Sequence, residues 1–372
     1  MKIGVLTLPF NNNYGGYLQA YALMTILKDM GHDVELIYRR GNKRPMSYRI
    51  KHTIKTIIKI VLGMNHGPII ANIEKEHRAK GEMMMPFVDK YITPKTRPLL
   101  STEELAHECK GKYDAIVVGS DQVWRPNYVP NIENFFLDFV EGEDIKKIAY
   151  AASFGNDNPE YTNSQKANCG ILIEKFDKVS LREESGINVI RSFGWKTQHE
   201  AEIVLDPTML LSKSYYETIL TNIENKGSYL LSYVLDENLE ARELVEHVCY
   251  TLGKKEYSVI DTKKWKRRGY KMPPIETWLD AFYNAEFVIT DSFHGTVFSI
   301  IFNKPFIVYA NKDRGIDRFT TLLKHVGLED RIITPSSSVK EILAKRVNWD
   351  SVNEKIRKKK ESSINFLVDI LS

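Results

Sequence analysis

The chain lacks the features that mark several common protein classes. Its 372 residues include only three cysteines, Cys109, Cys169 and Cys249, which lie far apart without paired spacing. This pattern indicates neither a disulfide framework nor a zinc site, and it fits a reducing compartment. No apolar run approaches the roughly 18 residues of a membrane-spanning helix, and the first run, residues 1–8, is too short for a secretory signal. We expect a cytoplasmic protein, with peripheral contact at the inner face of the membrane left open.

The chain also lacks a strong charge and a nucleotide-binding loop. Lys and Arg total 52 against 48 Asp and Glu, a net charge of +4, which is too small to mark a nucleic-acid-binding protein. The polar segment 11–16 contains two glycines but matches neither the GxGxxG nor the Walker pattern. We therefore expect no nucleic acid partner, and nothing in this segment indicates a bound nucleotide.

Short aliphatic runs alternate with segments of helical periodicity in both halves of the chain, as in doubly wound parallel sheets. The expected strands are 3–8, 34–38, 115–118, 147–152, 178–181, 229–235, 257–260, 287–290 and 305–309. We predict two Rossmann-like α/β domains facing each other across a cleft, at 1–205 and 206–350. A C-terminal helix follows at 351–372, for which packing back on the first domain is one option.

The most informative segment is the turn after the expected strand 287–290. This strand leads into Asp291, Ser292, Phe293 and His294, followed by an expected helix. Ligands bind at the carboxyl ends of strands in open α/β sheets, and helix N-termini attract anions. The turn therefore predicts a phosphate or carboxylate site. The alternative is that Asp291 or Ser292 only caps the helix and His294 is an ordinary first-turn residue.

Two further strand ends carry cationic residues. Arg182 follows strand 178–181, and Lys312 lies in the polar loop after strand 305–309. A guanidinium suits the geometry of a carboxylate or phosphate. The alternatives are an Arg182 paired with Glu183 or Glu184, and a solvated loop charge at Lys312.

A sugar would suit two other segments. Asp121 and Trp124 follow strand 115–118, where a carboxylate would accept from hydroxyls and an indole would cover a sugar ring. A structural turn with a packed Trp124 is the alternative. The backbone of residues 11–19 could also approach a ligand.

The segment 51–59 contains lysines and isoleucines at helical spacing. Lys51, Lys55 and Lys59 interleave with Ile54 and Ile58, which predicts a basic amphipathic helix able to lie on an anionic membrane. A helix packed on its own domain with solvated lysines is the alternative.

Taken in order, several of these segments resemble the polysaccharide pyruvyl transferase family. The matching blocks are GGYLQAYAL at 15–23, GSDQVW at 119–124, YAASFG at 150–155, SLREES at 180–185, VLDPT at 204–208 and SFHG at 292–295. The resemblance implies a GT-B-like fold and an enzyme of bacterial exopolysaccharide or capsular polysaccharide biosynthesis. It further implies transfer of pyruvate from phosphoenolpyruvate to two hydroxyls of a sugar as a cyclic ketal. Where many members have Arg-Leu-His, this chain has Ser292, Phe293 and His294.

Under this resemblance the donor site would comprise Arg182, Ser292, His294, Gly295 and Lys312. We expect His294 to be the general acid and Asp121 the base, with Asp291 as a second candidate. On the acceptor side we place Asn13, Tyr14, Gly15, Gln19, Asp121 and Trp124. No metal and no cofactor is expected beyond phosphoenolpyruvate as co-substrate.

The implied acceptor is an oligosaccharide linked to polyprenyl diphosphate. Two other functions stay open: a GT-B glycosyltransferase using a nucleotide sugar, and a sugar-binding protein without catalysis. The sequence does not indicate the oligomeric state.

Overall fold

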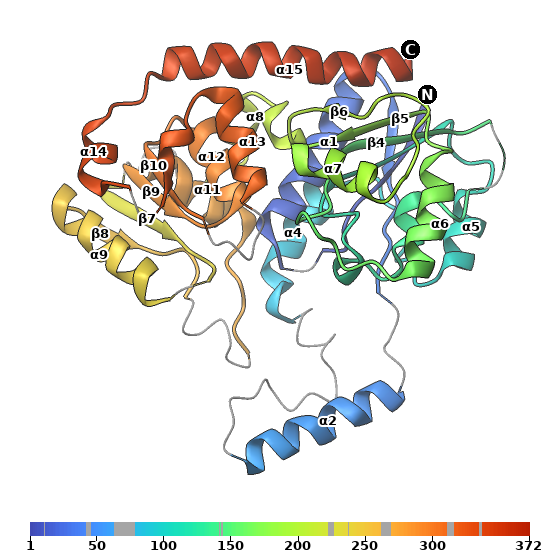
Figure 1. Cartoon of the computed structure of the whole chain (residues 1–372), viewed down its shortest axis with the longest axis horizontal. Coiled ribbons are helices and arrows are strands. Elements are labelled where there is room, and N and C mark those ends of the chain that lie inside the picture. Colours follow the sequence, from blue (N-terminus) through green and yellow to red (C-terminus); the bar gives the residue numbers. More distant parts are fainter. Residues whose placement is uncertain are drawn as a thin grey trace.

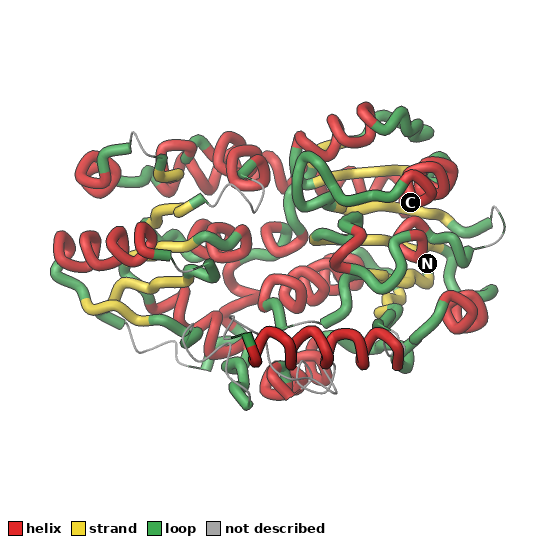
Figure 2. Tube along the Cα trace, turned by 60° about the horizontal axis from the view of Figure 1, so that its bottom comes forward, coloured by secondary structure: helices red, strands yellow, loops and turns green. Residues whose placement is uncertain are grey.

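The computed structural model describes residues 1–372 except 11, 42–45, 63–78, 141, 143, 222–226, 237, 262–268, 311–315 and 335–336. The chain forms two α/β lobes, each built on its own parallel sheet. Figure 2 shows the strands as two separate groups, each surrounded by helices.

The N-terminal lobe contains a six-stranded sheet of order β2-β1-β3-β4-β5-β6. Its strands are β1 (Lys2–Leu6), β2 (Asp33–Leu36), β3 (Ala115–Asp121), β4 (Lys146–Ala152), β5 (Lys178–Leu181) and β6 (Glu202–Ile203). Its described helices are α1 (Tyr14–Asp29), α4 (Met85–Tyr91), α5 (Thr102–Cys109), α6 (Asn163–Ile173) and α7 (Glu184–Ser192), and a separate helix, α2 (Met46–Val61), lies between β2 and α4 in the chain. All strand pairs are parallel.

The C-terminal lobe contains a five-stranded parallel sheet of order β11-β10-β9-β7-β8. Its strands are β7 (Tyr229–Tyr233), β8 (Lys255–Tyr257), β9 (Phe287–Thr290), β10 (Phe306–Tyr309) and β11 (Ile332–Ile333). Its helices are α8 (Lys213–Glu217), α9 (Leu239–Leu252), α11 (Ile275–Asn284), α12 (Phe293–Ile301), α13 (Asp317–Val326) and α14 (Val339–Ala344).

The central strands of both sheets are buried on both faces, which explains their continuous aliphatic runs. In β1, Ile3 and Val5 pack in one apolar cluster with α1, whereas Leu6 packs in a second cluster with α5 and α6. In β9, Val288 and Ile289 likewise belong to different clusters. The predicted two-lobed, doubly wound α/β architecture is confirmed.

The last helix, α15 (Trp349–Leu371), runs across both lobes along one side of the molecule (Figure 1). Ser363 Oγ accepts a hydrogen bond from the backbone N–H of Leu205 at 3.0 Å in the N-terminal lobe. Lys355 Nζ donates to the carbonyl of Val326 at 3.4 Å in the C-terminal lobe. The helix thus ties the lobes together.

Several predicted boundaries were wrong. Helix α1 begins at Tyr14, so Gly15 and Gly16 are helical rather than part of a loop. Helix α12 begins at Phe293 and has His294 in its first turn, the position named in the alternative for this segment. Strand β8 lies at Lys255–Tyr257 rather than 257–260, and the two-residue strands β6 and β11 are too short for a periodicity to reveal.

Candidate active site

The candidate site lies where the carboxyl ends of strands from the two sheets meet. Strand β3 ends at Asp121, β5 ends immediately before Arg182, and β9 leads through Asp291 into α12. The lobes also touch beside the site, because the backbone N–H of Glu184 donates to Thr321 Oγ1 at 3.3 Å. The structure therefore brings residues from both lobes to one place.

Arg182 is the centre of a buried charge cluster. Its side chain is almost fully buried, and each of its nitrogens faces a carboxylate. Nη2 contacts Asp121 Oδ1 at 2.9 Å, Nη1 contacts Asp206 Oδ2 at 3.1 Å, and Nε lies 3.5 Å from Glu183 Oε2. A buried guanidinium needs such partners, since an uncompensated charge there would be costly. Of the alternatives for Arg182, pairing with Glu183 is therefore correct, but two distant aspartates also take part.

Asp206 links the arginine to the histidine. One oxygen accepts from the backbone N–H and hydroxyl of Thr208, at 3.1 and 2.6 Å. The other accepts from Ser120 Oγ at 3.2 Å and Arg182 Nη1 at 3.1 Å, and lies 3.6 Å from His294 Nε2. Burial by itself would raise the pKa of Asp206, but His294, Arg182 and Thr208 outweigh it and the pKa is lowered. Asp206 is therefore a buried carboxylate with a lowered pKa, and one of its oxygens faces the imidazole of His294.

His294 is held by the start of α12 and by the opposite lobe. Ser292 caps the helix, since its Oγ accepts from the backbone N–H of Gly295 at 3.4 Å. A Cβ on Gly15, in the first turn of α1, would overlap the imidazole of His294. Gly15 is thus required because the histidine occupies the space of a side chain. The ring of Phe293 covers Arg182, with the guanidinium carbon 4.5 Å from the ring centroid.

Asp121 joins the cluster from an uncommon backbone conformation. Its φ is 71°, in the left-handed region that non-glycine residues rarely adopt. One carboxylate oxygen pairs with Arg182, and the other accepts from Asn13 Nδ2 at 3.4 Å. Just before it, the backbone N–H of Ser120 donates to the amide oxygen of Gln19 at 2.8 Å. Gln19 thus positions the turn that carries Asp121.

Arg318, in the first turn of α13, is a site residue that the sequence did not reveal. It is 8% exposed. Burial and the nearby charge of Arg182 lower the pKa of Arg318 to about 10, while Glu183 and Asp121 act in the opposite direction. Its segment shows only the pattern of an ordinary amphipathic helix. Asp206 did leave a signal, since it lies in the block 204–208, but no role was assigned to it.

The predicted catalytic residue Asp291 has a different role from the one expected. Asp291 accepts the backbone N–H groups of Leu235 and Asp236, both at 2.8 Å, so it holds the chain after β7 rather than capping α12. The carboxylate that pairs with His294 is Asp206. Lys312 lies outside the described residues.

Three predicted acceptor residues are packing residues in this structure. Trp124 is fully buried, stacks on Phe136 and donates through Nε1 to the carbonyl of Phe135 at 3.0 Å. The expectation that it covers a sugar ring is therefore wrong. Tyr14 and Gln19 are also buried, and their polar groups bond within the protein. Asn13, Gly15 and Asp121 are the predicted acceptor residues that lie beside the cluster.

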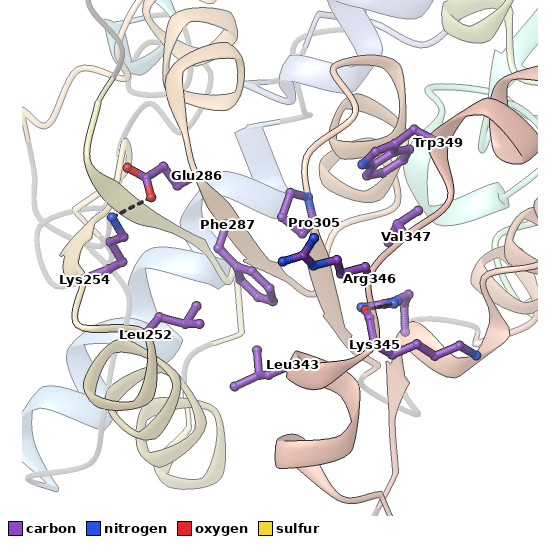
Figure 3. Close-up of a pocket in the computed structure, with 11 residues that line it drawn as sticks. Leu252, Lys254, Glu286, Phe287, Pro305, Leu343, Lys345, Arg346, Val347 and Trp349 are labelled. Carbon is purple, nitrogen blue, oxygen red and sulfur yellow. Dashed lines mark hydrogen bonds and ion pairs between the residues drawn. The ribbon is translucent and has the colours of Figure 1, made fainter.

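A cavity of about 400 Å³ lies elsewhere, at the amino-terminal ends of β9 and β10 (Figure 3). Its basic residues are largely satisfied within the protein. Lys254 pairs with Glu286 at 2.5 Å, Lys345 pairs with Asp330 at 2.6 Å, and Arg331 donates to backbone carbonyls. The cavity contains none of the predicted donor or acceptor residues.

Among the described residues, no group of three or more His, Cys, Asp and Glu side chains is arranged to hold a metal ion.

Similar solved structures define the class of fold. A UDP-GlcNAc 2-epimerase from Methanocaldococcus jannaschii has a TM-score of 0.52 at 13% identity, covering 100% of this chain and 99% of that chain. One from Rickettsia bellii has a TM-score of 0.53 at 11% identity, covering 99% and 96%. These likenesses show a GT-B-like fold, as predicted. No curated protein matches the chain.

The family follows from the sequence itself. The model of the family described as polysaccharide pyruvyl transferase matches residues 13–313, which include Arg182, Asp206 and His294. The chain belongs to this transferase family, as the sequence blocks predicted. Within the described residues, no helix is both long enough and apolar enough to cross a membrane.

Proposed function

We propose that the protein transfers the pyruvyl group of phosphoenolpyruvate to a sugar of a cell-surface polysaccharide precursor, forming a cyclic ketal and releasing phosphate. The observation that carries this proposal is the position of His294, paired with buried Asp206 at the N-terminus of α12 between the two lobes. A histidine oriented by a carboxylate can serve as a general acid. The positive end of the helix dipole favours an anionic donor beside it.

Phosphoenolpyruvate, the proposed donor, carries a carboxylate and a phosphate that the site must bind. We assign their binding to the start of α12 at Ser292, to His294 and to Lys312, with Arg318 adding positive charge from α13. Arg182 is proposed to act as a positioning residue, because its three nitrogens already face carboxylates. It would fix Asp121 and Asp206 in the orientation that the reaction needs.

In the proposed reaction, His294 protonates the methylene carbon of the donor, which becomes the ketal methyl group. The adjacent carbon then accepts one sugar hydroxyl, whose proton passes to Asp121. Phosphate leaves from that carbon, a second hydroxyl closes the ring, and its proton leaves with the phosphate. Two hydroxyl protons are released in all. In the overall balance, one replaces the proton that His294 gave to the methyl group, and the other protonates the phosphate.

For the acceptor we propose an oligosaccharide on polyprenyl diphosphate at the cytoplasmic face of the membrane. Asn13 and Gly15 would face it from the N-terminal lobe. Asn13 donates to Asp121 and Gly15 lies against His294, which favours hydroxyls entering from the α1 side.

The test is a product spectrum with phosphoenolpyruvate and a panel of lipid-linked oligosaccharides. The proposal predicts inorganic phosphate together with a new ketal methyl signal by NMR. Parallel incubations with nucleotide sugars serve as the comparison. Release of free nucleotide with no use of phosphoenolpyruvate would instead establish a glycosyltransferase, and sugar binding without donor affinity would establish a non-catalytic protein.

A further inference from the structure

Helix α2 stands apart from both lobes (Figure 1). It exposes several aliphatic side chains. Ile50, Ile54, Ile57, Ile58 and Val61 are between 47% and 78% exposed. Their spacing of three and four residues places them along one stripe of the helix. A contiguous apolar stripe of this kind marks a surface that contacts something outside the protein.

The apolar stripe is not the side of α2 that the rest of the protein covers. Thr56, which lies on the side of the helix opposite the stripe, is 5% exposed, so the covered side of α2 is not the isoleucine side. The isoleucines therefore point away from the covered side. These exposures argue against the alternative of a helix packed on its own domain with solvated lysines.

The charge of α2 indicates the kind of surface. Its sequence contains Arg49, Lys51, Lys55 and Lys59 but no acidic residue, and Lys55 is exposed. Two copies of this helix would repel each other, whereas an anionic lipid surface would attract both. Apolar residues flanked by lysines suit the boundary between acyl chains and anionic headgroups.

The position of α2 connects it with the candidate site. Because the sheet is parallel, the chain leaves β2 towards α2 at the same edge where Asp121 ends β3. On the return, the backbone N–H of Met272 donates to the carbonyl of Lys80 at 2.8 Å. A Cβ on Gly81 would overlap Asn12 Oδ1, next to the acceptor-side residue Asn13. The segment that carries α2 thus departs from the edge of the sheet that holds the site and returns beside that site.

We propose that α2 is an interfacial helix that lies on an anionic membrane surface with its isoleucine stripe in the lipid. Docking in this way presents the carboxyl edge of the N-terminal sheet to the membrane, where a lipid-linked acceptor would be found. That last step rests on the proposed function, whereas the docking itself does not.

The test is co-sedimentation of the full chain with phosphatidylcholine vesicles, with and without phosphatidylglycerol. The variant I54S/I58S/V61S should bind vesicles containing phosphatidylglycerol at least about tenfold more weakly. The matched control L239S/Y250S removes two exposed apolar side chains of α9 and should bind like the wild type. Changing Lys51, Lys55 and Lys59 to Gln should weaken binding about a hundredfold, and wild-type binding should fall as salt is raised.

Unchanged vesicle binding by the apolar variant, or no binding by the wild type, would overturn the proposal. So would a wild-type dimer in sedimentation velocity that the apolar variant dissociates, because the stripe would then serve a second copy. Phosphate release with a lipid-free acceptor should be equal in all these variants, which also reports that they fold. Vesicle binding without any phosphoenolpyruvate turnover would reject the proposed reaction and leave the docking intact.

Discussion

The lobe interface and helix α2 both carry positive charge, but their surroundings are opposite. At the interface, Arg182 is almost fully buried and meets three carboxylates within the protein. In α2, Lys55 is exposed on a helix without acidic residues, beside exposed isoleucines. A buried charge must be compensated where it stands, and this fixes its geometry. An exposed charge beside an apolar surface stays available to a binding partner. The lobe interface therefore suits catalysis, and helix α2 suits docking.

The largest expected effect is on turnover, which should depend on the lobe interface and not on helix α2. His294→Ala should lower turnover by roughly two to four orders of magnitude, because it removes the proposed general acid. Phosphate release from phosphoenolpyruvate with a lipid-free acceptor is the measurement. In the same assay, Ile54→Ser on α2 should leave turnover unchanged. Near-normal phosphate release by the histidine variant would remove its catalytic role.

The second effect separates the regions by stability. Asp206→Asn keeps the shape of the side chain but leaves Arg182 with less negative charge around it. Loss of one partner of a buried ion pair is expected to lower the free energy of unfolding by about 3–5 kcal/mol. Urea denaturation followed by circular dichroism measures this change. Lys55→Gln, on exposed α2, is the comparison and should not move the urea midpoint. Equal urea midpoints for the wild type, Asp206→Asn and Lys55→Gln would show that the charge cluster around Arg182 does not stabilise the fold.

A third change tests the contact between α1 and the histidine. Gly15→Ala introduces a methyl group where the imidazole of His294 lies. Displacing a catalytic group by about 1 Å typically costs around a hundredfold in rate. Gly16→Ala is the matched control in the same helical turn, since the nearest atom to its Cβ would be 3.8 Å away. Equal phosphate release by the two variants would show that Gly15 does not position His294.

The smallest effect concerns pH. Burial opposes ionisation of Asp206, yet His294, Arg182 and Thr208 lower its pKa below the ordinary value, which is about 3.9 for an unfolded chain. A carboxyl with a lowered folded-state pKa stabilises the fold above about pH 4, and this contribution is lost as the pH falls towards the folded pKa. The urea midpoint of the wild type should therefore decline more steeply below about pH 4 than that of Asp206→Asn. Parallel declines would place the pH dependence in other carboxyls.

Particular residues show how far the sequence could be read. Arg182, Asp121 and His294 were found because each follows an aliphatic run that ends at the carboxyl edge of a parallel sheet. Trp124 was misread because the same sequence position fits an exposed ring or a packed one. Arg318 left no signal, because an amphipathic helix pattern does not reveal which polar side chain will face another lobe.

The sequence by itself determined the alternation of strands and helices, the family, and the set of polar residues at the strand ends. These depend on local periodicity and on the common direction of parallel strands. Only the tertiary structure decided that Asp206 meets both Arg182 and His294, that Gly15 makes room for the imidazole, and that the isoleucines of α2 stay exposed. Burial and charge pairing arise between segments far apart in the chain, so no local pattern encodes them.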